Sequence, residues 1–152
     1  MELDTLAIVQ ARMGSVRLPG KVLKKINNKP LIAILLHRLS QAKNIDKIII
    51  ATTKNSEDDM LYKTIENLGY GLYRGKEHDV LNRYYNAAKK FNAKTIVRIT
   101  GDCPIIDSRL VDKIINLYNK SNVDYASCIQ PPSFPDGLDT EVFSFASLKE
   151  AN

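Results

Sequence analysis

The sequence is poor in the residues that support several common kinds of protein chemistry. Its 152 residues contain two cysteines, two histidines and no tryptophan. Cys103 and Cys128 have no CxxC spacing, which excludes a disulfide framework and argues against a zinc site. With both thiols expected to be free, the composition is typical of a reducing cytoplasm, and we expect a cytoplasmic protein.

Long apolar runs are also missing. The longest, residues 31–36, is followed by His37 and Arg38 and is far shorter than the ~18 residues that a membrane helix needs. The acidic start at residues 1–4 is unlike a secretory signal. Aromatic residues make up 7% of the chain and do not alternate with basic ones, as a base-stacking surface would require. We therefore expect neither a membrane nor a nucleic acid as partner, and the mild net charge of +5 is compatible with a small phosphate-rich ligand.

What is present is a globular composition, 44% hydrophobic and 26% charged. The length fits one domain of ordinary size, so a single domain is expected over residues 1–152. The last predicted helix starts at Ser144 and has no strand after it, which predicts a domain that is truncated at its C-terminus.

Apolar β-rich segments alternate with segments of helical periodicity. Strands are predicted at 6–10, 47–51, 70–73, 95–100, 124–127 and 139–143, and helices over 30–42, 56–68, 79–91, 107–118 and from 144 onward. This order predicts an α/β fold with a mainly parallel sheet, in which ligands bind beyond the carboxyl ends of the strands.

Several single residues are expected to define these helices. Pro30 is predicted at the first position of its helix, Ser56 and Asp107 as N-terminal caps, and Gly69 as a C-terminal stop. The apolar faces are predicted to include Leu68, Leu81 and Leu117.

The loop after the first strand has the strongest chemical signature. Three cations, Arg12, Arg17 and Lys21, stand among two glycines and a serine within ten residues, a composition suited to a triphosphate. A GxGxxG fingerprint is absent. The spacing also differs from a P-loop, because five residues separate Gly14 from Gly20 and Val22 follows Lys21. The alternative is a basic surface turn.

The second signature is Gly101-Asp102-Cys103-Pro104, directly after an apolar strand. A carboxylate at a strand end beside a phosphate-binding loop suits a Mg²⁺ ligand. The alternative is an aspartate that only stabilises a turn, and the spacing does not separate the two. Cys103 is expected to be a small buried side chain.

Weaker signals follow a Pro- and Gly-rich loop at 130–138. Asp139 and Glu141 alternate on a predicted strand and would face either a sugar or the solvent. His78 is expected to be a loop residue rather than a general base.

Residues 10–21, QARMGSVRLPGK, closely resemble the CMP-sugar synthetases, which are the cytidylyltransferases for sialic acid and 3-deoxy-manno-octulosonate. Three further motifs, at 74–85, 98–104 and 135–139, resemble the branch that contains the spore coat polysaccharide biosynthesis protein F. The resemblance covers nearly the whole chain.

The resemblance implies a three-layer, GT-A-like nucleotidyltransferase domain. Its expected reaction transfers CMP from CTP to a sugar acid with Mg²⁺, releasing pyrophosphate, in polysaccharide or surface-glycan biosynthesis. It also implies a set of site residues: phosphate-holding and catalytic Arg12 and Lys21, backbone contacts from Ala11, Gly14 and Ser15, Arg74 near the cytidine, Asp102 as catalytic metal ligand, and Asp139 and Glu141 facing the sugar.

The resemblance also bears on the alternative functions. Family members continue into a strand that supplies a second metal carboxylate, so this chain is expected to bind CTP but to turn it over slowly. A nucleotide-binding module without catalysis is therefore the competing reading. A glycosyltransferase ranks last, because no Asp-x-Asp motif occurs. A homodimer is a further expectation.

Overall fold

The computed structural model describes residues 3–152, so Met1 and Glu2 of the acidic start lie outside the described residues. A six-stranded sheet has the order β5-β4-β1-β6-β8-β7. Its strands are β1 (Leu3–Gln10), β4 (Lys47–Thr53), β5 (Gly71–Gly75), β6 (Ala93–Thr100), β7 (Tyr125–Ser127) and β8 (Glu141–Ser144). β5, β4, β1 and β6 are parallel, whereas β8 is antiparallel to β6 and to β7. The predicted α/β fold with a mainly parallel sheet is confirmed.

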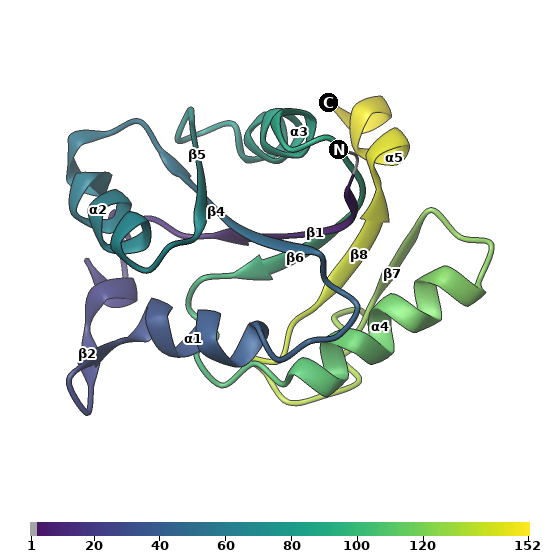
Figure 1. Ribbon diagram of the computed structural model, residues 1–152, viewed down its shortest axis with the longest axis horizontal. Coiled ribbons are helices and arrows are strands. Elements are labelled where there is room, and N and C mark those ends of the chain that lie inside the picture. Colours follow the sequence, from purple (N-terminus) through teal and green to yellow (C-terminus); the bar gives the residue numbers. More distant parts are fainter. Residues whose placement is uncertain (1–2) are drawn as a thin grey trace.

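Helices cover both faces of the sheet, giving the three layers visible in Figure 1. One face packs against α1 (Leu31–Leu39), α2 (Asp59–Asn67) and α4 (Ser108–Lys120), and the other against α3 (Val80–Lys90) and α5 (Phe145–Ala151). Alternate strand residues serve the two cores: Ala7 and Val9 of β1 face the first, and Leu6 and Ile8 the second. Burial on both faces explains why the central strands read as continuous apolar runs.

Short elements complete the chain between β1 and α1, and between β4 and α2. They are the 3₁₀ helices η1 (Lys21–Leu23) and η2 (Ser56–Asp58) and the two-stranded hairpin of β2 (Lys25–Ile26) and β3 (Lys29–Pro30). None of the helices within residues 3–152 has the length and apolar character that crossing a membrane requires.

Most predicted helix boundaries are confirmed by their caps. Asp107 accepts a hydrogen bond from the Arg109 amide, Ser144 accepts one from the Ser147 amide, and Gly69 adopts a left-handed φ of 79° after α2. The Ser56 cap is wrong, because Ser56 opens η2 and α2 starts only at Asp59, without a side-chain cap. Pro30 ends β3 and immediately precedes α1 rather than standing at its first position.

Three leucines of the predicted apolar faces lie outside the core. Leu68, Leu81 and Leu117 are 42%, 42% and 51% exposed. Leu68 directly follows the last residue of α2. Leu81 and Leu117 lie beside the buried stripes of their helices, whereas their neighbours Val80 and Tyr118 still pack against the cores. Strand bounds also shift: the strand predicted at 70–73 runs over 71–75, and that predicted at 139–143 runs over 141–144.

Candidate active site

The carboxyl ends of β1 and β6 lie side by side, and the pairing register places Gln10 opposite Thr100. The Gly101 amide donates to the Gln10 carbonyl at 2.8 Å. A Cβ on Gly101 would stand 2.7 Å from the Ala11 Cβ and 2.8 Å from that carbonyl. Only glycine permits this approach, and it brings the two strand-end loops together.

A pocket of about 320 Å³ opens above this junction. The loop after β1 contributes the cations Arg12, Arg17 and Lys21 to its wall, and the segment after β6 contributes Asp102. Ala11 and Ser15 also line it. A concave wall with three cations has the charge and the donor geometry that phosphate oxygens require.

Lys21 and Asp102, which stand 81 residues apart, form an ion pair across the pocket. Partial burial opposes ionisation of Asp102, but the hydrogen bond and the positive charge of Lys21 together bring the pKa of the carboxyl below its usual value. The ionised carboxylate is the form that can accept a cation.

The loop after β1 closes on Met13. The Met13 carbonyl accepts hydrogen bonds from the Ser15 amide at 2.8 Å and the Gly20 amide at 2.9 Å. Gly20 has a φ of 68°, a left-handed conformation that favours glycine. The loop therefore returns to its own base, and the position of Met13 fixes the position of the loop.

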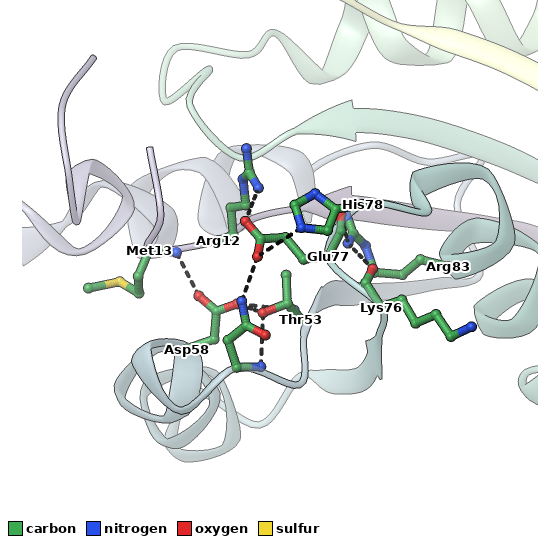
Figure 2. A network of polar contacts seen from close by, with 9 residues as sticks. Arg12, Met13, Thr53, Asp58, Lys76, Glu77, His78 and Arg83 are labelled. Atoms are coloured by element: carbon green, nitrogen blue, oxygen red, sulfur yellow. Dashed lines mark hydrogen bonds and ion pairs between the residues drawn. The ribbon is translucent and has the colours of Figure 1, made fainter. Parts of the chain in front are cut away.

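Carboxylates that follow neighbouring parallel strands hold this base (Figure 2). Asp58, from the segment after β4, is fully buried and accepts the Met13 amide at 2.6 Å. It also accepts the amide of Thr53 at 3.1 Å and the hydroxyl of the same residue. Glu77, after β5, accepts from Arg12 Nη1 at 2.5 Å.

Asp58 and Glu77 are not among the site residues predicted from the sequence. Asp58 stands in the run Glu57-Asp58-Asp59, which resembles the acidic first turn of a helix. The rule that ligand sites lie beyond parallel strand ends offered a signal, because each carboxylate follows such a strand.

The structure does not bring Arg74 into the wall of the pocket. Its guanidinium donates to the carbonyls of Thr53 at 2.7 Å and Asn55 at 2.8 Å, and to the Asp59 carboxylate at 2.7 Å. It also lies over the Tyr62 ring, 5.6 Å from the centroid. Arg74 therefore fixes the segment between β4 and α2.

The two carboxylates predicted to face a sugar have different surroundings. Asp139 is half-buried in the segment before β8. Glu141 pairs with Arg98 of the adjacent strand and accepts the Tyr125 hydroxyl at 2.7 Å. Its carboxylate is thus occupied within the sheet. Gly14 lies against Glu57, whose Oε1 would be 2.5 Å from a Cβ at that position.

Both cysteines are free and buried, as expected for this composition. Burial raises the pKa of the Cys103 thiol, and the negative charges of Asp102, Asp139 and Asp136 raise it further against a hydrogen bond to Thr100. The thiol is therefore held in its neutral form. His78 has an exposed side chain in the segment before α3.

Within residues 3–152, no group of three or more His, Cys, Asp or Glu side chains is arranged to hold a metal ion. Among these described residues, Asp102 alone offers a carboxylate in the pocket wall. One carboxylate fits Mg²⁺ as part of a shell that phosphate oxygens and water complete, because Mg²⁺ retains several waters and commonly takes only one or two carboxylates.

Comparison with known proteins gives the family. The family model described as Cytidylyltransferase matches residues 6–152. The spore coat polysaccharide biosynthesis protein SpsF of Bacillus subtilis is 38% identical over 85% of this chain and 55% of its own length. The 3-deoxy-manno-octulosonate cytidylyltransferase 2 of Hydrogenovibrio crunogenus is 28% identical over 97% of this chain and 60% of its own length.

A solved cytidylyltransferase structure from Leptospira borgpetersenii superposes with a TM-score of 0.92 at 33% identity, over 98% of this chain and 63% of that one. The chain thus spans about three fifths of the length of these relatives. The match of the family model over almost every residue, together with this superposition, shows that the chain belongs to the cytidylyltransferase family.

Proposed function

We propose that the protein transfers CMP from CTP to a sugar acid and releases pyrophosphate, in the synthesis of a polysaccharide or surface glycan. The observation that carries the proposal is the pocket at the carboxyl ends of β1 and β6, where three cations from one loop face a carboxylate. The family and the names of the relatives support cytidine as the base and a sugar acid as the acceptor.

In this proposal Arg12 and Lys21 hold the triphosphate, with Arg17 as a third cation on the same wall. Ala11, Gly14 and Ser15 supply backbone contacts. Arg74 acts near the cytidine by ordering the segment between β4 and α2, to which its guanidinium is bonded.

On the acceptor side, Asp139 belongs to the segment that faces the sugar. For Glu141, the same role requires release from Arg98 and Tyr125. Because two separate partners hold this carboxylate, binding a sugar through Glu141 would cost more free energy than binding it through Asp139.

The chemistry is in-line transfer at the α-phosphorus. A hydroxyl of the sugar acid attacks and forms a new phosphorus–oxygen bond, and its proton passes to solvent. The bond from the α-phosphorus to the bridging oxygen breaks, and its electron pair leaves with pyrophosphate. Arg12, Arg17 and Lys21 stabilise the negative charge that develops on the leaving pyrophosphate. Asp102 would hold Mg²⁺, which would supply further charge neutralisation.

Pyrophosphate release tests the proposal. The protein is incubated with CTP, Mg²⁺ and a panel of sugar acids, with UTP, ATP and GTP as matched replacements for CTP. Release that needs both CTP and one of the acids is the expected result. Release with all four nucleotides would show that only the phosphates are read.

A nucleotide-binding module without catalysis is the second candidate. It is favoured by the single carboxylate in the pocket wall of the described residues, because two metal-bound carboxylates neutralise more transition-state charge than one. CTP binding without pyrophosphate release for any acid would support this candidate.

The cellular setting belongs to the same proposal. Two free, buried thiols suit a cytoplasmic enzyme. A homodimer without nucleic-acid partners remains our expectation, and sedimentation equilibrium with and without CTP measures the oligomeric state.

A further inference from the structure

Glu77 reaches the predicted phosphate-binding loop from a different part of the sheet. Arg12 Nη1 donates to Glu77 Oε1 at 2.5 Å, and Asn55 Nδ2 donates to Glu77 Oε2 at 2.7 Å. Figure 2 shows the side chains of Arg12 and Glu77 pointing toward one another. Both carboxylate oxygens are therefore held, one from the loop after β1 and one from the segment after β4.

The backbone of Glu77 is anchored as well. Arg83 of α3 is 2% exposed, and its Nη1 donates to the carbonyls of Lys76 at 2.8 Å and Glu77 at 3.3 Å. A buried guanidinium is costly to leave without these acceptors, so the turn at 76–77 is fixed relative to α3. Glu77 is thus a rigid support and not the tip of a free loop.

Arg12 keeps donors for a ligand. Across residues 3–152, the structure gives Nε and Nη2 of Arg12 no protein partner, while Nη1 is held by Glu77. The Arg12 side chain is 39% exposed and lines the pocket. An arginine whose orientation is set in advance loses less side-chain freedom when it binds a phosphate.

A competing role for Glu77 is an internal anion that a triphosphate must displace from Arg12. Asn55 and Arg83 argue against it, because both hold Glu77 independently of Arg12. We infer that Glu77 is a positioning residue, which orients Arg12 so that its free donors meet the phosphates of the bound nucleotide. This inference rests on the proposed function.

A double-mutant cycle measured by calorimetric CTP binding tests it. The proteins are wild type, Glu77→Ala, Arg12→Ala and the double variant, with Glu66→Ala on the exposed side of α2 as matched control. We expect Glu77→Ala to weaken CTP binding about tenfold when Arg12 is present and less than about twofold when it is absent. The control should bind like wild type.

Glu77→Gln sharpens the test, because it keeps an oxygen for Arg12 but removes the charge. It should retain CTP affinity within about threefold of wild type. If Glu77→Ala does not fold, as judged by circular dichroism, the cycle is completed with Glu77→Gln. The smaller loss of CTP affinity in that variant must then be seen with Arg12 present and not with Arg12→Ala.

Two outcomes would overturn the inference: tighter CTP binding by Glu77→Ala, which indicates a competing anion, or equal weakening with and without Arg12. Either can occur while the wild type binds CTP and releases pyrophosphate, which leaves the proposed function intact. Conversely, a wild type that prefers another nucleoside triphosphate contradicts the proposed function, and the cycle is then run with that nucleotide.

Discussion

The pocket lies at the carboxyl ends of the parallel strands, and the two halves of the sheet on either side of it are built differently. On the side of β4 and β5, one carboxylate after each strand holds the loop that follows β1. Asp58 binds Met13, and Glu77 binds Arg12. At β8 and β7, the connecting residues 131–136 are exposed, and the carboxylate of Glu141 is bound within the sheet, to Arg98 and Tyr125. The side proposed for the nucleotide is therefore preorganised by the parallel core, whereas the side proposed for the acceptor is supported mainly by antiparallel pairing.

Removing the buried carboxylate at the nucleotide side should have the largest effect. Asp58→Ala leaves the amides of Met13 and Thr53 without their acceptor in a buried site. We expect it to lower the free energy of unfolding by about 3 kcal/mol. Urea denaturation measures the change. Asp136→Ala, in the exposed segment between β7 and β8, is the control and should cost less than about 0.5 kcal/mol. Similarly small losses of unfolding free energy for both variants would show that the two sides of the pocket do not differ in this way.

The cations of the loop come next. Arg12→Ala and Lys21→Ala should each weaken CTP binding by about 1.5–3 kcal/mol, the range for a lost hydrogen bond to a charged group. Titration calorimetry measures the affinities, and Lys63→Ala on the exposed side of α2 serves as control. Unchanged affinity in both loop variants would remove the phosphate-binding assignment.

Glu141 separates a structural role from an acceptor-binding one. Glu141→Ala takes the carboxylate partner from Arg98 and the acceptor from the Tyr125 hydroxyl. We expect a loss of about 1–2 kcal/mol in unfolding free energy, with CTP affinity unchanged. Thermal and urea unfolding give the stability. Wild-type stability combined with a raised KM for the sugar acid would instead place Glu141 at the acceptor.

The smallest effect concerns Asp102 and acid. Lys21 lowers the pKa of the Asp102 carboxyl in the folded state, so its ionised form contributes stability above the unfolded value of about 3.9. That contribution fades as the pH falls below this value and through the folded pKa. The stability difference between wild type and Asp102→Asn should therefore be constant near neutrality and shrink below about pH 4. A stability difference that grows as the pH falls would contradict the lowered pKa of Asp102.

Much of the fold follows from local patterns. The apolar runs of the central strands, the cap at Asp107, the helix start at Ser144 and the stop at Gly69 are encoded within a few residues, and the structure confirms them. Errors fall at the borders of the apolar stripes, as at Leu81 and Leu117, which lie beside the buried residues of their helices. Helical periodicity gives the direction of a side chain, but the neighbouring layer decides how wide the covered stripe is.

The residues of the candidate site likewise fall into those that the sequence predicts and those that only the structure reveals. The sequence by itself determined the cationic loop and the carboxylate at Asp102, because each is a short run of residues at the end of an apolar strand. Only the tertiary structure decided that Glu77 and Asp58 hold the base of that loop, since strand order sets which ends are neighbours. It also decided that Glu141 lies opposite Arg98, because the antiparallel register of β6 and β8 fixes their pairing across 43 residues of sequence.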